Sequence, residues 1–205
     1  MKFIAFSGVD GSGKSTQLAL LKEKLERENW NVAYFHAVEF SLANRIARFF
    51  KGQKSFQPGT EKASVKASWF SLHMRLKFLF IDMIRFWFFH NKLRRENCAY
   101  LLSDRYFYDS LINIEYLAQK ISFLKPIIDL GVKILAKWMP KADIAFFFDI
   151  TSENILSRER VPEQGIEYLR AKQTLFKQKI LKWNMIVIDA DRDTDTIFQN
   201  ILKRI

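Results

Sequence analysis

The sequence of 205 residues has few of the residues that build cross-linked, metal-binding or segmented proteins. A single cysteine, Cys98, excludes an internal disulfide and favours a reducing, cytoplasmic location. With three histidines and no Cys/His cluster at zinc-ligand spacing, no zinc site is predicted. The seven glycines and four prolines form no linker-like run, and no fixed-period repeat occurs. We therefore expect one domain over residues 1–205.

The sequence pattern predicts neither a membrane span nor a targeting peptide. Residues 1–6 lead directly into an apolar strand rather than a signal-peptide cleavage site, so we expect the mature fold to begin at residue 1. The most apolar stretch, residues 76–89, is short and carries Lys77, Asp82 and Arg85, which argues against a membrane span. We interpret it as a buried helix whose surplus of large rings packs partly against a second subunit.

The net charge of +11 raises the question of a nucleic-acid partner. The basic residues are spread along the chain, and only residues 92–95 form a local knot, beside Glu96. A protein that handles phosphorylated small molecules also needs surplus positive charge. Nucleotide handling is therefore favoured over nucleic-acid binding.

What the sequence does contain is a phosphate-binding loop at residues 8–15, which read GVDGSGKS and match the GxxxxGKS spacing of a P-loop. An apolar strand precedes it and a helix follows, as the motif requires. The glycines let consecutive backbone N–H groups point at phosphate oxygens, Lys14 neutralises charge, and the Ser15 hydroxyl is a ligand for Mg²⁺. The sequence predicts an ATP site at Gly8, Val9, Asp10, Gly11, Ser12, Gly13, Lys14, Ser15 and Thr16.

Five short apolar segments alternate with helical patterns along the whole chain, which predicts an α/β fold: a five-stranded parallel sheet flanked by helices. The expected strands are 2–7, 32–36, 99–103, 144–149 and 185–189. The first expected helix begins near Lys14, and the next four cover 41–51, 61–90, 109–120 and 122–138. Three more are expected towards the end of the chain: one that begins at residue 152, one that ends near residue 182 and one that ends at residue 205. Ligands bind at the carboxyl ends of such strands, where Asp104 and Asp149 also fall.

A second motif, Asp104-Arg105-Tyr106, follows the third expected strand. A carboxylate at that place can approach Mg²⁺ from the side opposite Ser15, and the neighbouring guanidinium can bind a phosphate with two parallel hydrogen bonds. An Asp-Arg pair alone is more often a surface ion pair. After a strand of a P-loop chain, we interpret Asp104 as a metal ligand and Arg105 as a phosphate-binding residue.

With both motifs in view, the chain resembles the thymidylate kinases among the nucleoside-monophosphate kinases. Residues 6–17 are similar to the family's P-loop signature, and Asp104-Arg105-Tyr106 to its DRY motif. Residues 140–158 are similar to its fourth strand and lid entry, and 187–190 to its last strand. The resemblance is weakest between residues 37 and 98.

This resemblance implies a P-loop kinase fold with a short helical lid at about residues 158–166, and commonly a homodimer. It implies transfer of the ATP γ-phosphoryl group to dTMP, giving dTDP, with Mg²⁺ on the donor phosphates. Such a reaction depends on positioned cations. Gly11 stands where some members carry an arginine, which leaves the lid residues Arg158 and Arg160 to close over the phosphates. The implied catalytic residues are Lys14, Asp104, Arg105, Arg158 and Arg160.

The resemblance also implies an acceptor site. Asp10 matches a family aspartate that meets the acceptor sugar, with a turn-stabilising role as the alternative. Arg105 binds the acceptor phosphate and Arg75 reads the base edge. Phe70 and Tyr106 pack against the base or sugar, although a core role is equally expected for either ring. By the same analogy, residues 190–193 lie beside adenine.

Departures from the family pattern concentrate in the acceptor site. Ser7 replaces a glutamate, and Asn113 and Ile114 replace a Tyr-Gln pair. The Arg-Glu-Pro segment after the second strand is absent; Arg45 or Arg48 on the following helix is the candidate to substitute for its arginine, with a surface cation as the equal alternative. Arg85 competes with Arg75 for the same alignment. Two alternatives therefore stay open: a P-loop kinase for another nucleotide, nucleoside or small acceptor, and a nucleotide-binding regulator with weak catalysis. A GTPase is disfavoured because no Asn-Lys-x-Asp motif occurs.

Overall fold

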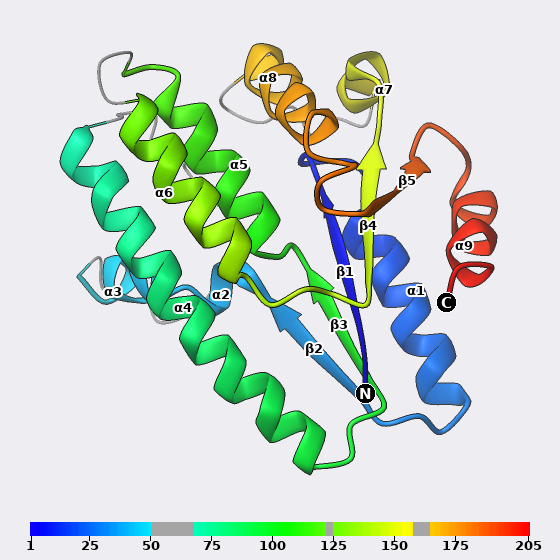
Figure 1. The fold of residues 1–205 in the computed structure, drawn as a ribbon. Coiled ribbons are helices and arrows are strands. Elements are labelled where there is room, and N and C mark those ends of the chain that lie inside the picture. The colour runs from blue at the N-terminus through cyan, green and yellow to red at the C-terminus, as the bar shows by residue number, and fades with distance from the viewer. Residues whose placement is uncertain (51–67, 122–124, 158–164) are drawn as a thin grey trace.

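The computed structural model describes residues 1–50, 68–121, 125–157 and 165–205 (Figure 1). Five parallel strands form one sheet in the order β2-β3-β1-β4-β5, which confirms the predicted fold class. The P-loop strand β1 lies at the centre, between β3 and β4. The strands are β1 (Lys2–Gly8), β2 (Val32–His36), β3 (Tyr100–Asp104), β4 (Ile144–Asp149) and β5 (Met185–Asp189).

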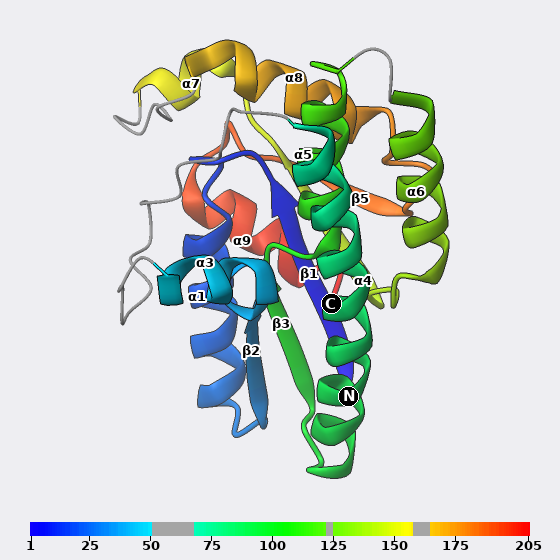
Figure 2. The same ribbon diagram turned by 90° about the vertical axis from the view of Figure 1, so that its left-hand side faces the viewer.

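Helices cover both faces of the sheet and one of its ends. One face carries α1 (Lys14–Arg27) and α9 (Thr194–Leu202). The other carries α4 (Trp69–Arg95), α5 (Phe107–Ala118) and α6 (Lys125–Trp138). Figure 2 shows α7 (Ser152–Ser157) and α8 (Gly165–Lys177) across the carboxyl ends of the strands. The short helices α2 (Ala37–Phe40) and α3 (Leu42–Phe50) follow β2.

Two apolar clusters hold these layers together, one on each face of the sheet. Successive side chains of a strand point to opposite faces. In β1, Phe3 and Ala5 therefore belong to the cluster under α4 and α5, whereas Ile4 and Phe6 belong to the cluster under α1. Burial of both faces explains why the strands read as unbroken apolar runs. No described helix has the length and apolar character needed to cross a membrane.

Strand boundaries match the sequence prediction closely, and helix boundaries less so. β3 runs one residue further than expected, so that Asp104 is its last residue. The helix expected at 61–90 is described from Trp69 and continues to Arg95. Helix α2 was not predicted; its cap is the His36 ring nitrogen Nδ1, which accepts from Glu39 N at 3.4 Å. Most of the expected lid lies outside the described residues.

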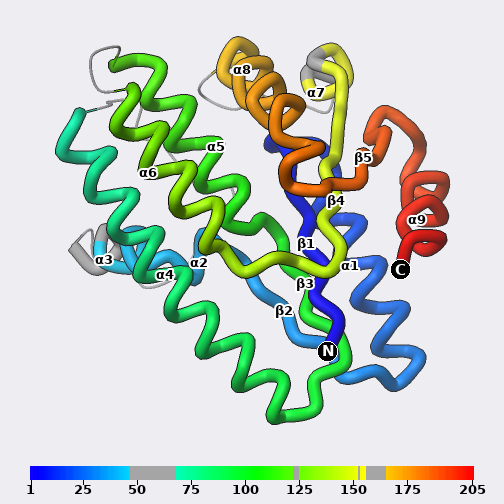
Figure 3. Tube along the Cα trace, in the orientation of Figure 1, coloured from blue at the N-terminus to red at the C-terminus, as the bar shows by residue number. Residues whose placement is uncertain are grey.

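Figure 3 follows the chain from β1 to its end after α9. The end of the chain returns to the first strand, because Lys2 Nζ donates to the Ile205 carbonyl oxygen at 2.5 Å. That bond joins the two termini at the amino end of β1, the end opposite the P-loop.

Candidate active site

The P-loop wraps around the end of β1 through glycines in conformations that other residues rarely adopt. Gly8, Gly11 and Gly13 have φ angles of 143°, 82° and 84°. At Gly8 the backbone also approaches β4 closely: a Cβ atom would lie 2.8 Å from the Phe148 carbonyl oxygen. The loop therefore requires glycine at its first position on two grounds, backbone conformation and space.

Lys14, the first residue of α1, is buried inside this loop with 5% of its surface exposed. Its Nζ donates to the Val9 carbonyl oxygen at 2.6 Å and to Ser12 Oγ at 3.1 Å. Burial and then the charge of Arg105 lower the pKa of Lys14, against the raising effect of Asp10 and other carboxylates. An anionic phosphate at the helix N-terminus would favour the charged amine.

The predicted metal ligands lie together. Pairing of β1 with β3 sets Asp104 opposite Phe6, and Ser15 Oγ donates to Asp104 Oδ2 at 2.6 Å. These are oxygen atoms, the donors that Mg²⁺ prefers. Among the described residues no group of three or more His, Cys, Asp or Glu could hold a metal. Two protein oxygens fit Mg²⁺, which takes most of its remaining ligands from substrate phosphates and water in kinase sites.

Arg105 stands in a strained backbone conformation that aims its side chain at the P-loop. Its φ of 60° lies in the left-handed region, which a non-glycine residue adopts at a cost of about 1–3 kcal/mol. The backbone is held there because Arg105 N donates to the Phe6 carbonyl at 2.9 Å and Ser103 Oγ donates to the Arg105 carbonyl at 2.7 Å. The guanidinium donates to Asp10 Oδ1, forming an ion pair.

The Asp10 carboxylate is surrounded by positive charge. Burial acts to raise its pKa, but Arg105, Lys14 and Lys172 together outweigh burial, so the pKa of Asp10 lies below its ordinary value. Asp10 is thus held ionised at the tip of the loop. It joins the P-loop to the end of β3 through Arg105.

Asp109, which sequence reasoning missed, fixes both motifs in place. Its Oδ1 accepts from Gly8 N at 3.3 Å and its Oδ2 accepts from Tyr106 N at 3.1 Å. An acidic residue at the third position of α5 that accepts from the residue before the helix is a known cap signal. That signal could have identified Asp109, although not its bond to Gly8.

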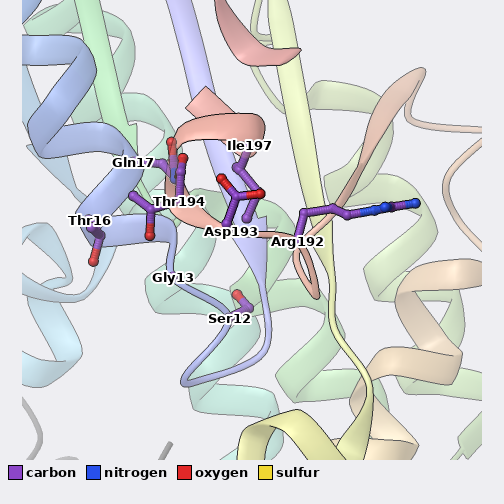
Figure 4. Close-up of a pocket in the computed structure, with 8 residues that line it drawn as sticks. All are labelled: Ser12, Gly13, Thr16, Gln17, Arg192, Asp193, Thr194 and Ile197. Atoms are coloured by element: carbon purple, nitrogen blue, oxygen red, sulfur yellow. The ribbon is translucent and has the colours of Figure 1, made fainter. Parts of the chain in front are cut away.

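A pocket of about 250 Å³ lies between the P-loop and the segment that follows β5 (Figure 4). Its walls are Ser12, Gly13, Thr16, Gln17, Arg192, Asp193, Thr194 and Ile197. Residues 192 and 193 belong to the loop that the family resemblance sets beside adenine. The adjacent phosphate loop makes this pocket the candidate place for the nucleoside of ATP.

The predicted acceptor residues divide into those near the site and those used elsewhere. Tyr106 is fully buried and its hydroxyl donates to the Pro140 carbonyl at 2.7 Å, so its place is in the core rather than against an acceptor. Arg85 donates to Asp82 Oδ1 at 2.5 Å and to the Phe40 carbonyl at 2.9 Å, which ties it to the end of α2. Arg85 is therefore a structural cation.

Arg75 lies near Tyr168 of α8, and its Nε donates to Ser71 Oγ at 3.5 Å, so its role at the base edge stays a prediction. Burial lowers the pKa of Arg75 while the interaction with Tyr168 raises it. Phe70 is 67% exposed in the first turn of α4, and Arg45 is exposed on α3. No contact in the described part of the chain joins Phe70 or Arg45 to the P-loop, so their acceptor roles stay predictions. The expected lid arginines, Arg158 and Arg160, and the alternative Arg48 side chain lie outside the described residues.

Lys172 and Tyr168, which sequence reasoning missed, meet Asn113 between α5 and α8. Lys172 Nζ donates to the Tyr168 hydroxyl at 3.0 Å, and that hydroxyl donates to Asn113 Oδ1 at 3.5 Å. Asn113 is one of the residues that departs from the family pattern. No contiguous motif marks the other two, because only folding brings α8 over the strand ends.

A central P-loop strand in a parallel sheet, with the Asp104 carboxylate at the end of the neighbouring strand and bonded to Ser15, defines a P-loop nucleotide-binding protein. No family model matches the chain. It is 30% identical over 217 residues to the thymidylate kinase of Thermosipho melanesiensis, covering 99% of this chain and 96% of the relative. It is 26% identical to the thymidylate kinase of Mycoplasma capricolum, covering 98% and 92%. The chain belongs to the thymidylate kinase family.

A solved structure agrees at the level of the fold. The crystal structure of thymidylate kinase from Ehrlichia chaffeensis superposes with a TM-score of 0.53 and 21% identity. The match covers 99% of this chain and 97% of that chain. The five-stranded parallel sheet with flanking helices is therefore the fold of that enzyme.

Proposed function

We propose that the protein transfers the γ-phosphoryl group of ATP to dTMP, giving dTDP, with Mg²⁺ as cofactor. Membership of the thymidylate kinase family supports the reaction class. The observation that carries the proposal is the double link between the two motifs, Ser15 to Asp104 and Asp10 to Arg105. These links bring the proposed metal ligands and the proposed phosphate-binding arginine to the P-loop.

Each residue of this arrangement has a role that follows from its chemistry. The backbone N–H groups of the P-loop and Lys14 would bind the ATP phosphates, with the nucleoside in the pocket beside Arg192. Ser15 and Asp104 would hold Mg²⁺, which neutralises charge on the donor phosphates when bound. Stabilising charge and fixing positions is most of the catalysis in phosphoryl transfer.

Arg105 would receive the acceptor phosphate. A guanidinium has five N–H donors, so Arg105 can keep one on Asp10 and turn others to a phosphate. Arg75, on the α8 side, is the candidate for the base edge. Arg158 and Arg160 complete the proposal as lid cations, within a single kinase domain over 1–205. The open alternatives, another acceptor or a regulator without turnover, are less favoured by the family membership.

The same proposal includes a homodimer and a cytoplasmic location, the latter resting on the lone buried Cys98. The dimer is supported by an apolar face on two neighbouring helices, whose exposed side chains recur at helical spacing. This apolar face consists of Phe80, Ile81, Ile84, Trp87 and Phe88 of α4 with Ile127, Leu130, Ile134 and Trp138 of α6. A second copy of the chain is its proposed occupant.

The test is ADP release from ATP and Mg²⁺ with a panel of nucleoside monophosphates. We expect selective stimulation by dTMP, and loss of activity in Lys14→Ala. Lys24→Ala, an exposed lysine on the same helix, is the matched control and should retain activity. Stimulation by another acceptor, or none by any acceptor, would reject the proposal.

A further inference from the structure

Asp191, in the loop after β5, is a carboxylate that joins two distant segments of the chain. Its Oδ1 accepts from Thr151 N at 2.9 Å, from Thr151 Oγ1 at 3.1 Å and from Asn154 Nδ2 at 2.8 Å. Its Oδ2 accepts from Thr151 N at 3.1 Å. Thr151 directly precedes α7 and Asn154 lies within it. The loop after β5 is therefore bonded to the start of α7, although Asp191 and Thr151 are 40 residues apart in sequence.

The same loop is also bonded to the ends of β4 and β5. Ala190 N donates to the Asp149 carbonyl oxygen at 2.8 Å, and Asp191 N donates to Asp189 Oδ1 at 3.1 Å. Asp189 Oδ2 accepts from Arg192 Nε at 2.9 Å. The strand ends thus hold the beginning of the turn from β5 to α9, and the Asp191 carboxylate joins that turn to α7.

This turn forms one wall of the pocket beside the P-loop. Arg192, Asp193 and Thr194, which directly follow Asp191, line the pocket on this side (Figure 4). On the P-loop side, Gln17 Nε2 donates to the Thr194 carbonyl oxygen at 2.9 Å. The wall is thus tied to α1 at one end and to α7 at the other. Because its carboxylate bonds to α7, Asp191 would act on the pocket through its neighbours in the chain rather than by touching a ligand.

We propose that Asp191 is a positioning residue for the nucleoside of ATP, because it holds the wall at residues 192–194 in place before ATP binds. This inference rests on the proposed function, which puts the ATP nucleoside in this pocket. A ligand that must order a loop loses affinity by that cost, so a wall that is already ordered gives tighter binding. The triphosphate binds the P-loop instead, so the effect of Asp191 should be confined to the nucleoside.

Calorimetric titration with two ligands separates the nucleoside from the triphosphate. The ligands are a non-hydrolysable ATP analogue and inorganic tripolyphosphate, each with Mg²⁺, and the second carries the phosphate chain without a nucleoside. Asp191→Ala should weaken binding of the ATP analogue about 10-fold, as expected for losing a hydrogen bond to a charged group. Its affinity for tripolyphosphate should match that of the wild type. Asp195→Ala, which removes an exposed acid from the first turn of α9, is the matched control and should bind both ligands as the wild type does.

An exchange of the two hydrogen-bonding partners tests the contact itself. Asn154→Asp sets a second carboxylate against Asp191, so it should weaken binding of the ATP analogue in the same direction as Asp191→Ala. Adding Asp191→Asn to Asn154→Asp restores one donor and one acceptor between the two side chains. This double variant should bind the ATP analogue more tightly than Asn154→Asp alone, and a double variant that binds it no better would count against the contact.

Equal weakening for both ligands in Asp191→Ala, or weakening for neither, would overturn the proposal. A wild type that binds the ATP analogue no more tightly than tripolyphosphate would overturn it too, because the pocket would then hold no nucleoside. Phosphoryl transfer to dTMP judges the proposed function separately. If the wild type does not phosphorylate dTMP, but Asp191→Ala loses affinity for the ATP analogue alone, the transfer is refuted and the role of Asp191 is supported.

Discussion

Replacing Gly8 by alanine is a direct test of how the P-loop is built. The new Cβ would lie 2.8 Å from the Phe148 carbonyl oxygen and 3.4 Å from Phe148 N. These are backbone atoms of β4, which pairs with β1 on one side and β5 on the other. Because the clash is with backbone atoms, a side-chain rotation cannot relieve it. Moving β4 away would break its hydrogen bonds to β1 and β5.

The magnitude follows from two contributions. A side chain at φ 143° is strained by about 1–3 kcal/mol, and overpacking against a fixed group costs a further 1–3 kcal/mol or so. We expect Gly8→Ala to lower the free energy of unfolding by about 3 kcal/mol. For a chain of this length that lowers the Tm by roughly 6–12 °C.

Two other glycines provide matched controls. Gly165 has φ 79°, and no atom of the described residues lies within 4 Å of the added Cβ, so Gly165→Ala should cost only the conformational strain, about 1–2 kcal/mol. At Gly131 in α6 the Cβ would meet the movable end of Leu76 at 2.9 Å, and the gain in helix propensity, about 1 kcal/mol, offsets the contact. Unfolding followed by circular dichroism gives all three values. A Gly8→Ala variant as stable as Gly165→Ala would refute the steric argument.

Two further predictions concern pH and assembly. The pKa of Asp10 is lowered in the folded protein, so the ionised carboxylate stabilises the fold. This contribution to the free energy of unfolding is fully present above pH 3.8, the ordinary pKa of the group in the unfolded chain, and is lost as the pH falls through the folded-state pKa. Asp10→Asn should therefore lose less stability than the wild type below about pH 3.8 in urea unfolding, and parallel losses would contradict this sign. The proposed dimer predicts that light scattering gives twice the mass of one chain for the wild type. The double variant Trp87→Lys/Ile134→Lys should give the mass of a single chain. Trp30→Lys, an exposed tryptophan outside the apolar face, should stay dimeric, and a dimer in the double variant would reject this interface.

The sequence predicted those parts of the site that are contiguous in the chain. The P-loop could be assigned because its spacing, glycines and flanking strand and helix all lie within a few residues. The place of Asp104 beside the P-loop could be predicted because a polar residue that ends a buried strand lies at the carboxyl ends of a parallel sheet, where ligands bind. Pairing of β3 beside β1 then brings it to Ser15.

Residues that reach the site from other elements were predicted poorly. Tyr106 follows a strand end, where an aromatic ring can point into the core or towards a ligand. The sequence could not distinguish these two orientations, and the structure shows the ring in the core, packed against Phe3 and Phe35. Lys172 carries no local signal, because a lysine in a helix is ordinarily solvated. Its burial depends on how α8 packs on the rest of the fold, which no short stretch of sequence determines.

The most direct test of the central claim is the fate of the phosphoryl label. The protein is incubated with Mg²⁺, dTMP and ATP labelled at the γ-phosphorus, and the nucleotides are separated by anion exchange. The account predicts label in dTDP, at a rate that falls to background in Lys14→Ala. Label released only as inorganic phosphate, or retained in ATP, would contradict it.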